Sequence, residues 1–85
     1  MARYKLVVRR SVANDLRSLP QADVARILAR IETLQVDPRP PGCEKLSGLE
    51  RYRLRQGVYR ILYEIADEVL TVVVVKVGHR REVYR

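Results

Sequence analysis

Two segments of the chain concentrate arginines: YRLRQGVYR at residues 52–60 and VGHRREVYR at residues 77–85. Arg53 and Arg55 are two positions apart, so on an extended strand their side chains leave the same face. The second segment follows a long apolar run and contains His79, Arg80, Arg81 and Tyr84. Guanidinium groups bind pairs of phosphate oxygens and stay charged at any working pH. If the two segments lie on neighbouring strands, they form one phosphate-binding face, and nucleic acid is the expected ligand.

The alternative for Arg53 and Arg55 is a solvated strand face, which is the usual meaning of alternating charge on a strand. Their surroundings argue against it. Arg60 lies just across a short turn, and Arg80 follows the strand that we expect to pair with the strand of Arg60. So many like charges repel one another unless an anion lies among them. The array as a whole therefore favours an anion-binding surface.

Tyr84 and His79 are the candidate proton-transfer groups of this array. A tyrosine has an unperturbed pKa of about 10, and surrounding guanidiniums would lower the pKa of Tyr84. His79 is the only histidine, and it is either a proton-transfer group or a hydrogen-bonded residue at a strand end. Cys43 has no basic residue adjacent to it in the sequence and is interpreted as structural or incidental. One histidine and one cysteine cannot build a multi-ligand zinc site, so we expect neither a metal nor any other cofactor.

The composition favours binding to a polyanion. The chain has 85 residues, with 17 basic and 10 acidic side chains and a net charge of +7. Such a charge attracts polyanions through counterion release, but it does not separate RNA from DNA or from an acidic protein. The start MARYKLVV is too short and too charged for a signal peptide, and no apolar run approaches the roughly 18 residues of a membrane span. We expect a soluble, cytoplasmic protein without a membrane partner.

The first half of the chain predicts one strand and two helices. Alternation from Tyr4 to Val8 predicts the strand. From Ser11 apolar residues recur at spacings of four and three, which predicts a short helix that Pro20 interrupts. The second helix carries an apolar stripe made of Val24, Ile27, Leu28, Ile31 and Leu34. The proline-rich segment 37–42 cannot continue this helix and is expected to form an ordered linker.

The second half predicts three strands, at residues 52–56, 59–65 and 69–77. Short turns between them make neighbouring strands antiparallel. The last strand, VLTVVVVKV, is apolar at both parities, so we expect it to be central in the sheet and covered on both faces. The predicted fold is one α+β domain over residues 1–85: a strand, a two-helix hairpin and three antiparallel strands in a four-stranded sheet, with the helices on one face and the arginines on the other.

The chain resembles the RelE/ParE toxins of bacterial and archaeal type II toxin–antitoxin modules, and most of all the RelE-type messenger-RNA endonucleases. The resemblance covers nearly the whole chain and is most specific in the segments KLSGL, YRLRQGVYRILYEI and VVVVKVGHRREVYR. RelE-type toxins cut messenger RNA in the ribosomal A site, and an antitoxin that wraps them holds them inactive. The resemblance therefore implies a ribosome-dependent endoribonuclease, with a RelB-like antitoxin as its partner in a toxin–antitoxin hetero-oligomer.

The resemblance also implies roles for single residues. Arg60 matches the arginine that stabilises the phosphate transition state, Arg80 the second catalytic arginine near the leaving group, and Tyr84 the tyrosine proposed as general base. Arg53 and Arg55 match basic residues, often lysines, that hold the RNA backbone. An arginine cannot readily release a proton, so acid or base duty at those two positions would shift to another group.

The remaining basic residues are expected to contribute general electrostatic attraction for RNA. Lys45 and Arg81 would extend the RNA-binding footprint. His79 stands where some members of the family have lysine, and no established role transfers to it. Tyr84, His79 or a ribosomal group could carry out the proton transfer that Arg53 and Arg55 cannot.

Two other functions remain as alternatives. The ParE branch of the same fold poisons DNA gyrase and lacks the nuclease residues. A non-catalytic nucleic-acid-binding module could use the same basic face. The presence of both Arg60 and Tyr84 favours the nuclease.

Overall fold

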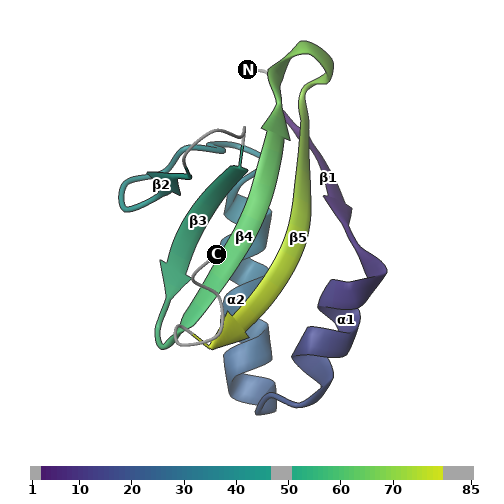
Figure 1. Cartoon of the computed structure of the whole chain (residues 1–85), viewed down its shortest axis with the longest axis vertical. Coiled ribbons are helices and arrows are strands. Elements are labelled where there is room, and N and C mark those ends of the chain that lie inside the picture. Colours follow the sequence, from purple (N-terminus) through teal and green to yellow (C-terminus); the bar gives the residue numbers. More distant parts are fainter. Residues whose placement is uncertain (1–2, 47–50, 80–85) are drawn as a thin grey trace.

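The computed structural model describes residues 3–46 and 51–79, and it has the predicted mixed α+β fold. The elements follow in the order β1 (Lys5–Val8), α1 (Arg10–Arg17), α2 (Gln21–Thr33), β2 (Glu44–Lys45), β3 (Arg51–Gln56), β4 (Tyr59–Ala66), the 3-10 turn η1 (Asp67–Val69) and β5 (Thr71–His79). Over the described ranges, the strands form a single sheet in the order β1-β5-β4-β3-β2 (Figure 1). Within those ranges, neither helix is long and apolar enough to cross a membrane.

Within residues 3–46 and 51–79 the sheet has five strands, one more than the sequence predicted. The additional strand is β2, which comprises two residues and pairs antiparallel with β3 at the edge of the sheet. Two residues are too few to leave a periodic pattern in the sequence, so alternation could not reveal this strand. The other strands lie where alternation placed them, within one or two residues at most of their ends.

β5 is an interior strand, because it pairs parallel with β1 and antiparallel with β4. The expectation that both of its faces are covered is met on one face only. Val72, Val74 and Val77 are fully buried, whereas Val73 and Val75 stay partly exposed. The buried positions change parity because the register shifts at a β-bulge opposite Leu62 and Tyr63. In the described part of the chain, both helices lie on the same side of the sheet (Figure 1).

The hydrophobic core lies between α2 and the covered face of the sheet. From α2, Ile27 and Ile31 project onto the sheet at helical spacing, followed by Leu34 at its C-cap, and all three are buried. They meet the buried alternate residues of the hairpin, Tyr52, Leu54, Ile61, Tyr63 and Ile65. Truncating one such isoleucine to alanine costs about 2–5 kcal/mol of folding free energy, which is a large share of the stability of so small a domain.

α1 covers the part of β5 that β1 does not reach. The pairing of β1 with β5 ends at Val8 opposite Val74, and α1 then lies beside the rest of β5 (Figure 1). There the carboxylate of Asp15 takes the place of a neighbouring strand: its Oδ2 accepts a hydrogen bond from the Val77 amide at 3.1 Å. Lys76 Nζ lies 3.8 Å from the other oxygen of Asp15. This contact satisfies an amide at an otherwise open sheet edge.

A second polar cluster, here called the Asp67 cluster, consists of Tyr4, Arg39, Tyr52 and Asp67. Arg39 donates to Asp67 Oδ2 at 2.9 Å and to the Tyr52 hydroxyl at 3.0 Å. The Tyr4 hydroxyl donates to Asp67 Oδ1 at 2.7 Å. The Arg39 guanidinium and the Tyr4 hydroxyl hold the pKa of Asp67 below its usual value. The cluster ties the N-terminal strand and the proline-rich segment to η1, the turn between β4 and β5.

Candidate functional site

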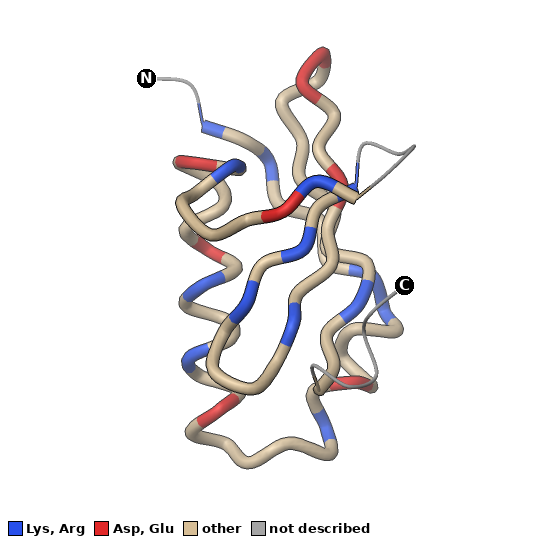
Figure 2. The backbone as a smooth tube through the Cα atoms, turned by 60° about the vertical axis from the view of Figure 1, so that its left-hand side comes forward, with Lys and Arg blue, Asp and Glu red and all other residues tan. Residues whose placement is uncertain are grey.

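The β3–β4 hairpin gathers arginines on the uncovered side of the sheet. Its register sets Arg51 opposite Glu64, Arg53 opposite Leu62 and Arg55 opposite Arg60. Directly opposite residues of antiparallel strands share a face, so one surface, here called the arginine face, carries Arg51, Arg53, Arg55 and Arg60. Figure 2 shows the basic segments on both strands of this hairpin. The alternate residues point into the core, and their packing fixes which way the arginines face.

Two members of the arginine face have carboxylate partners. Arg51 Nη2 donates to Glu64 Oε2 at 2.7 Å, and Arg9 reaches the other oxygen of Glu64 at 3.9 Å. Arg53 Nε and Nη2 donate to Glu44 Oε1 at 3.3 and 3.1 Å. The expected uncompensated repulsion is therefore wrong for Arg53, because Glu44 compensates its charge. Glu64 does the same for Arg51, which the predicted array did not include. Sequence reasoning missed Glu44 because it lies on β2, and its only signal was proximity to the arginine segment.

Arg55 and Arg60 face each other without such compensation. No carboxylate within residues 3–46 and 51–79 forms an ion pair with either guanidinium. Arg60 Nε is buried and has no hydrogen-bond partner in that part of the chain. A buried donor without an acceptor is costly, and two facing cations repel. A bound phosphate would supply oxygen acceptors and negative charge to both groups.

The arginine face continues into an apolar half. Leu62 lies between Arg53 and Lys76 in the register and is only 3% exposed. Farther across the sheet, Glu64 is opposite Val73, which is in turn opposite Val7 on β1. The uncovered side thus presents cations over β3 and the start of β4, and partly exposed valines over β5 and β1.

His79 lies on the other side of the sheet from Arg60. In the register His79 is opposite Tyr59, whereas Arg60 is opposite Gly78. The Tyr59 and His79 rings meet edge to face, with 6.3 Å between their centroids. His79 therefore faces the helices, together with Tyr59.

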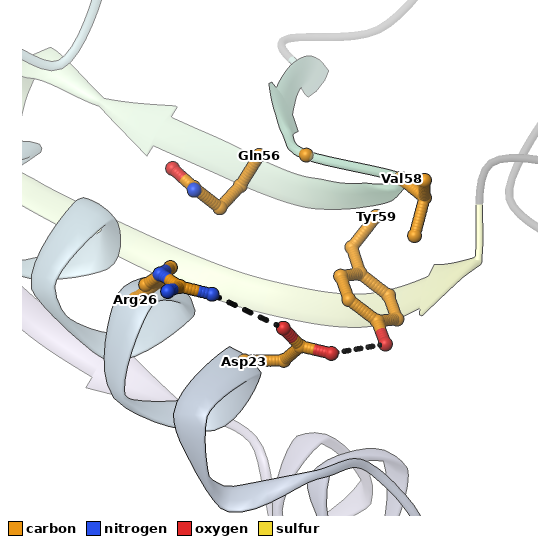
Figure 3. Close-up of a pocket in the computed structure, with 6 residues that line it drawn as sticks. Asp23, Arg26, Gln56, Val58 and Tyr59 are labelled. Carbon is orange, nitrogen blue, oxygen red and sulfur yellow. Dashed lines mark hydrogen bonds and ion pairs between the residues drawn. The ribbon is translucent and has the colours of Figure 1, made fainter.

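Tyr59 joins the end of the hairpin to α2. Its hydroxyl donates to Asp23 Oδ2 at 2.8 Å, and Arg26 Nη1 lies 3.5 Å from Asp23 Oδ1 (Figure 3). The hydrogen bond to this carboxylate and partial burial raise the pKa of Tyr59 above its usual value. A cavity of about 250 Å³ lies beside this contact, between α2 and the hairpin turn at Gly57. The sequence offered one hint of this contact, the acidic residue in the first turn of α2.

Of the other predicted site residues, the structure describes only Lys45. Lys45 lies on β2 opposite Tyr52, so it alternates to the other face from Arg53. Arg80, Arg81 and Tyr84 lie outside the described residues. The structure therefore brings Arg53, Arg55 and Arg60 together on one face. Within the described ranges there is no group of three or more histidine, cysteine, aspartate or glutamate side chains that could hold a metal ion.

Comparison with known proteins places this chain in a class of toxins. A family model described as the ParE toxin of type II toxin–antitoxin systems matches residues 6–84. This match spans most of the chain, which therefore belongs to that family. Within it, the chain is a RelE-like toxin, since its relatives carry Rel names.

The relatives are bacterial and archaeal. The chain shares 30% identity with a chain of the toxin–antitoxin complex RelBE2 from Mycobacterium tuberculosis, with a TM-score of 0.82 over 94% of both chains. A chain of the RelE–RelB complex from Pyrococcus horikoshii has 29% identity and a TM-score of 0.82, over 91% of this chain and 94% of that one. The toxin RelG of Mycobacterium tuberculosis is 50% identical over 34 residues, which are 40% of this chain and 39% of RelG.

Proposed function

We propose that this toxin is a metal-independent endoribonuclease that cleaves messenger RNA on the ribosome. The observation that carries the proposal is the facing pair Arg55 and Arg60, whose guanidiniums have no carboxylate partner in the described part of the chain. A phosphate held between them supplies oxygen acceptors to the guanidiniums and compensates both charges. Arg53 lies on the same face and extends the contact along the RNA backbone.

The proposed reaction needs no cofactor. The ribose 2′-oxygen attacks the adjacent phosphate, a cyclic phosphate forms as the bond to the 5′-oxygen breaks, and the 5′-oxygen takes up a proton from water. Arg60 neutralises the charge that develops on the phosphate oxygens. Following the family resemblance, Tyr84 accepts the proton of the 2′-hydroxyl and Arg80 assists the leaving oxygen.

The position of His79 supports Tyr84 as the general base. A base must come within hydrogen-bonding reach of the attacking oxygen, on the same side of the sheet as the phosphate. His79 faces the helices with Tyr59, away from Arg60. Arg53 and Arg55 remain charged at any working pH and transfer no proton.

We also infer that a RelB-like antitoxin is the partner of this toxin. The RelBE2 and RelE–RelB structures named above are toxin–antitoxin complexes. The uncovered side of this sheet combines cations over β3 with exposed apolar residues such as Val7. An antitoxin segment with acidic and apolar side chains complements both halves, and a disordered segment can fold onto such a surface.

A second candidate function is inhibition of DNA gyrase. The observation that favours it is the family model, which is described by the ParE toxin. The basic arginine face would then bind a protein or DNA surface without cutting RNA.

Expression of the chain alone in bacterial cells, followed by mapping of messenger-RNA ends, separates the two functions. The nuclease predicts new 5′ ends within translated regions soon after induction. Gyrase inhibition predicts double-strand breaks in DNA and intact messenger RNA. Breaks in DNA without new RNA ends would overturn the proposed nuclease. Co-expression of the antitoxin should abolish the new RNA ends.

A further inference from the structure

We propose that Tyr59 and Asp23 form a latch that positions Arg60 on the arginine face. The two residues touch no phosphate themselves in this scheme, so they are positioning residues. The effect on the position of the Arg60 side chain follows from the contacts of Tyr59 and Asp23. The effect on the rate of RNA cleavage rests in addition on the proposed function.

The latch acts on the residue directly before Arg60. Tyr59 begins β4, and successive side chains of a strand leave opposite faces, so Tyr59 points to the helices while Arg60 points to the arginine face. The Tyr59 hydroxyl holds Asp23 of α2 at 2.8 Å, and Arg26 lies on the far side of that carboxylate (Figure 3). A fixed Tyr59 fixes the backbone direction from which the Arg60 side chain departs.

Arg60 needs such support because its own side chain lacks it. Its Nε has no acceptor in the described part of the chain, and its cross-strand neighbour Arg55 repels it. On its C-terminal side Ile61 is fully buried. Arg60 is thus held between an anchored core residue and a latched tyrosine.

The hairpin turn is exposed to solvent and is not packed against the core. Gly57 adopts a positive φ of 61°, and Val58 is 48% exposed. Without the latch, the last cross-strand pair, Gln56 with Tyr59, would hold this end of the hairpin mainly through its backbone hydrogen bonds. Backbone pairs beside an exposed loop open at a lower free energy than pairs in the core of a sheet.

The matched pair of variants is Tyr59→Phe and Tyr4→Phe. Each removes one hydroxyl that donates to a carboxylate, at 2.8 Å to Asp23 and at 2.7 Å to Asp67. Each keeps its ring and therefore most of its packing. Tyr4 directly precedes β1 and belongs to the Asp67 cluster, at the opposite end of the sheet from the hairpin turn. A change in Arg60 Nε exchange or in kcat that occurs in Tyr59→Phe and not in Tyr4→Phe is therefore an effect of the latch.

The first measurement is hydrogen exchange at Arg60 Nε by nuclear magnetic resonance, which needs no RNA. Because this nitrogen is buried, its proton should exchange slowly in the wild type and in Tyr4→Phe. Loss of a hydrogen bond to a charged group corresponds to a factor of about ten or more, so exchange in Tyr59→Phe should be at least about tenfold faster. Equal exchange in the two variants overturns the latch.

The second measurement is cleavage of ribosome-bound messenger RNA, with kcat and KM determined separately. Misplacement of a catalytic group by about 1 Å costs up to roughly a hundredfold, so Tyr59→Phe should lower kcat between about tenfold and a hundredfold while KM changes little. Asp23→Asn keeps an oxygen acceptor and should retain most of kcat, whereas Asp23→Ala should match Tyr59→Phe. The double variant Tyr59→Phe with Asp23→Ala should lose no more than either single variant.

Three results of the cleavage measurement would also overturn the proposal: equal loss of kcat in Tyr4→Phe and Tyr59→Phe, loss in Asp23→Asn as large as in Asp23→Ala, or additive losses in the double variant. A wild-type protein that cuts no RNA refutes the proposed function, while the exchange measurement still decides whether the latch positions Arg60.

Discussion

At the scale of single residues, the site is defined by which arginines form an ion pair with a carboxylate and which do not. Arg53 is only 18% exposed and is held by Glu44, whereas Arg55 and Arg60 face each other with no carboxylate partner in the described ranges. The two-residue spacing of Arg53 and Arg55 was sufficient to predict their common face. The compensating acid was not predictable, because its placement depends on a two-residue strand pairing.

The Glu44 carboxylate should compete with phosphate for Arg53. We expect Glu44→Gln to raise the affinity for a non-cleavable single-stranded RNA. An exposed ion pair is worth up to about 1 kcal/mol, so the gain should be about fivefold at most. One additional phosphate contact should also steepen the slope of log K against log salt by about 0.7. Binding isotherms at several salt concentrations measure both quantities.

The matched control is Glu68→Gln, which removes the same charge in η1, at the turn between β4 and β5. It should leave the salt slope unchanged. Weaker RNA binding by Glu44→Gln than by the wild type would mean that Glu44 positions Arg53 instead of competing for it.

At the scale of elements, periodicity predicted the helices and strands that are long and buried on one face. The stripe on α2 and the alternation of β3 and β4 follow directly from their apolar spacing. The partial exposure of β5 was not predictable, because its valine run has no period and a bulge changes its parity. The capping of its edge by α1 depends on one side chain, Asp15, whose target lies 62 positions away.

Removal of that edge contact should destabilise the domain. Asp15→Ala leaves the Val77 amide without its acceptor, and Val77 is 1% exposed. An unsatisfied buried amide costs about 1–3 kcal/mol, so the free energy of unfolding should fall by that amount. Urea titration measures the loss. Asp15→Asn keeps an acceptor oxygen and should lose clearly less, and equal losses in the two variants would exclude the edge-capping role.

At the scale of the whole molecule, the sheet is held at both ends by carboxylates. Asp23 secures the hairpin end, and Asp67 secures the opposite end through Arg39 and Tyr4. The sequence predicted an α+β fold with both helices on one face of the sheet, and the structure agrees. It could not predict these long-range contacts, because neither partner of such a pair leaves a local pattern.

The Asp67 cluster gives the fold a defined response to acid. The Arg39 guanidinium, with the Tyr4 hydroxyl, lowers the pKa of Asp67 in the folded state, so the unfolded state binds more protons as the pH falls. The stabilisation is therefore complete above the unfolded pKa of about 4 and is lost as the pH drops through the lower folded value. The difference in unfolding free energy between the wild type and Asp67→Asn should shrink below about pH 4.

Chemical denaturation at a series of pH values tests this response. Arg39→Met removes the main cause of the lowered pKa of Asp67, so the free energy of unfolding should fall less steeply as the pH drops below about 4. A wild-type minus Asp67→Asn difference that stays constant from pH 7 to pH 3 would show that the cluster does not perturb Asp67.

The most direct test of the nuclease is the rate at which Arg60→Ala cuts messenger RNA on programmed ribosomes. The control is Arg17→Ala, which removes the same charge from an exposed position on α1. Loss of one preorganised charge contact to the transition state costs on the order of a hundredfold or more in rate. We therefore expect Arg60→Ala to cut at least about a hundredfold more slowly and Arg17→Ala to cut at the wild-type rate. A folded Arg60→Ala protein that cuts as fast as the wild type would contradict the central claim.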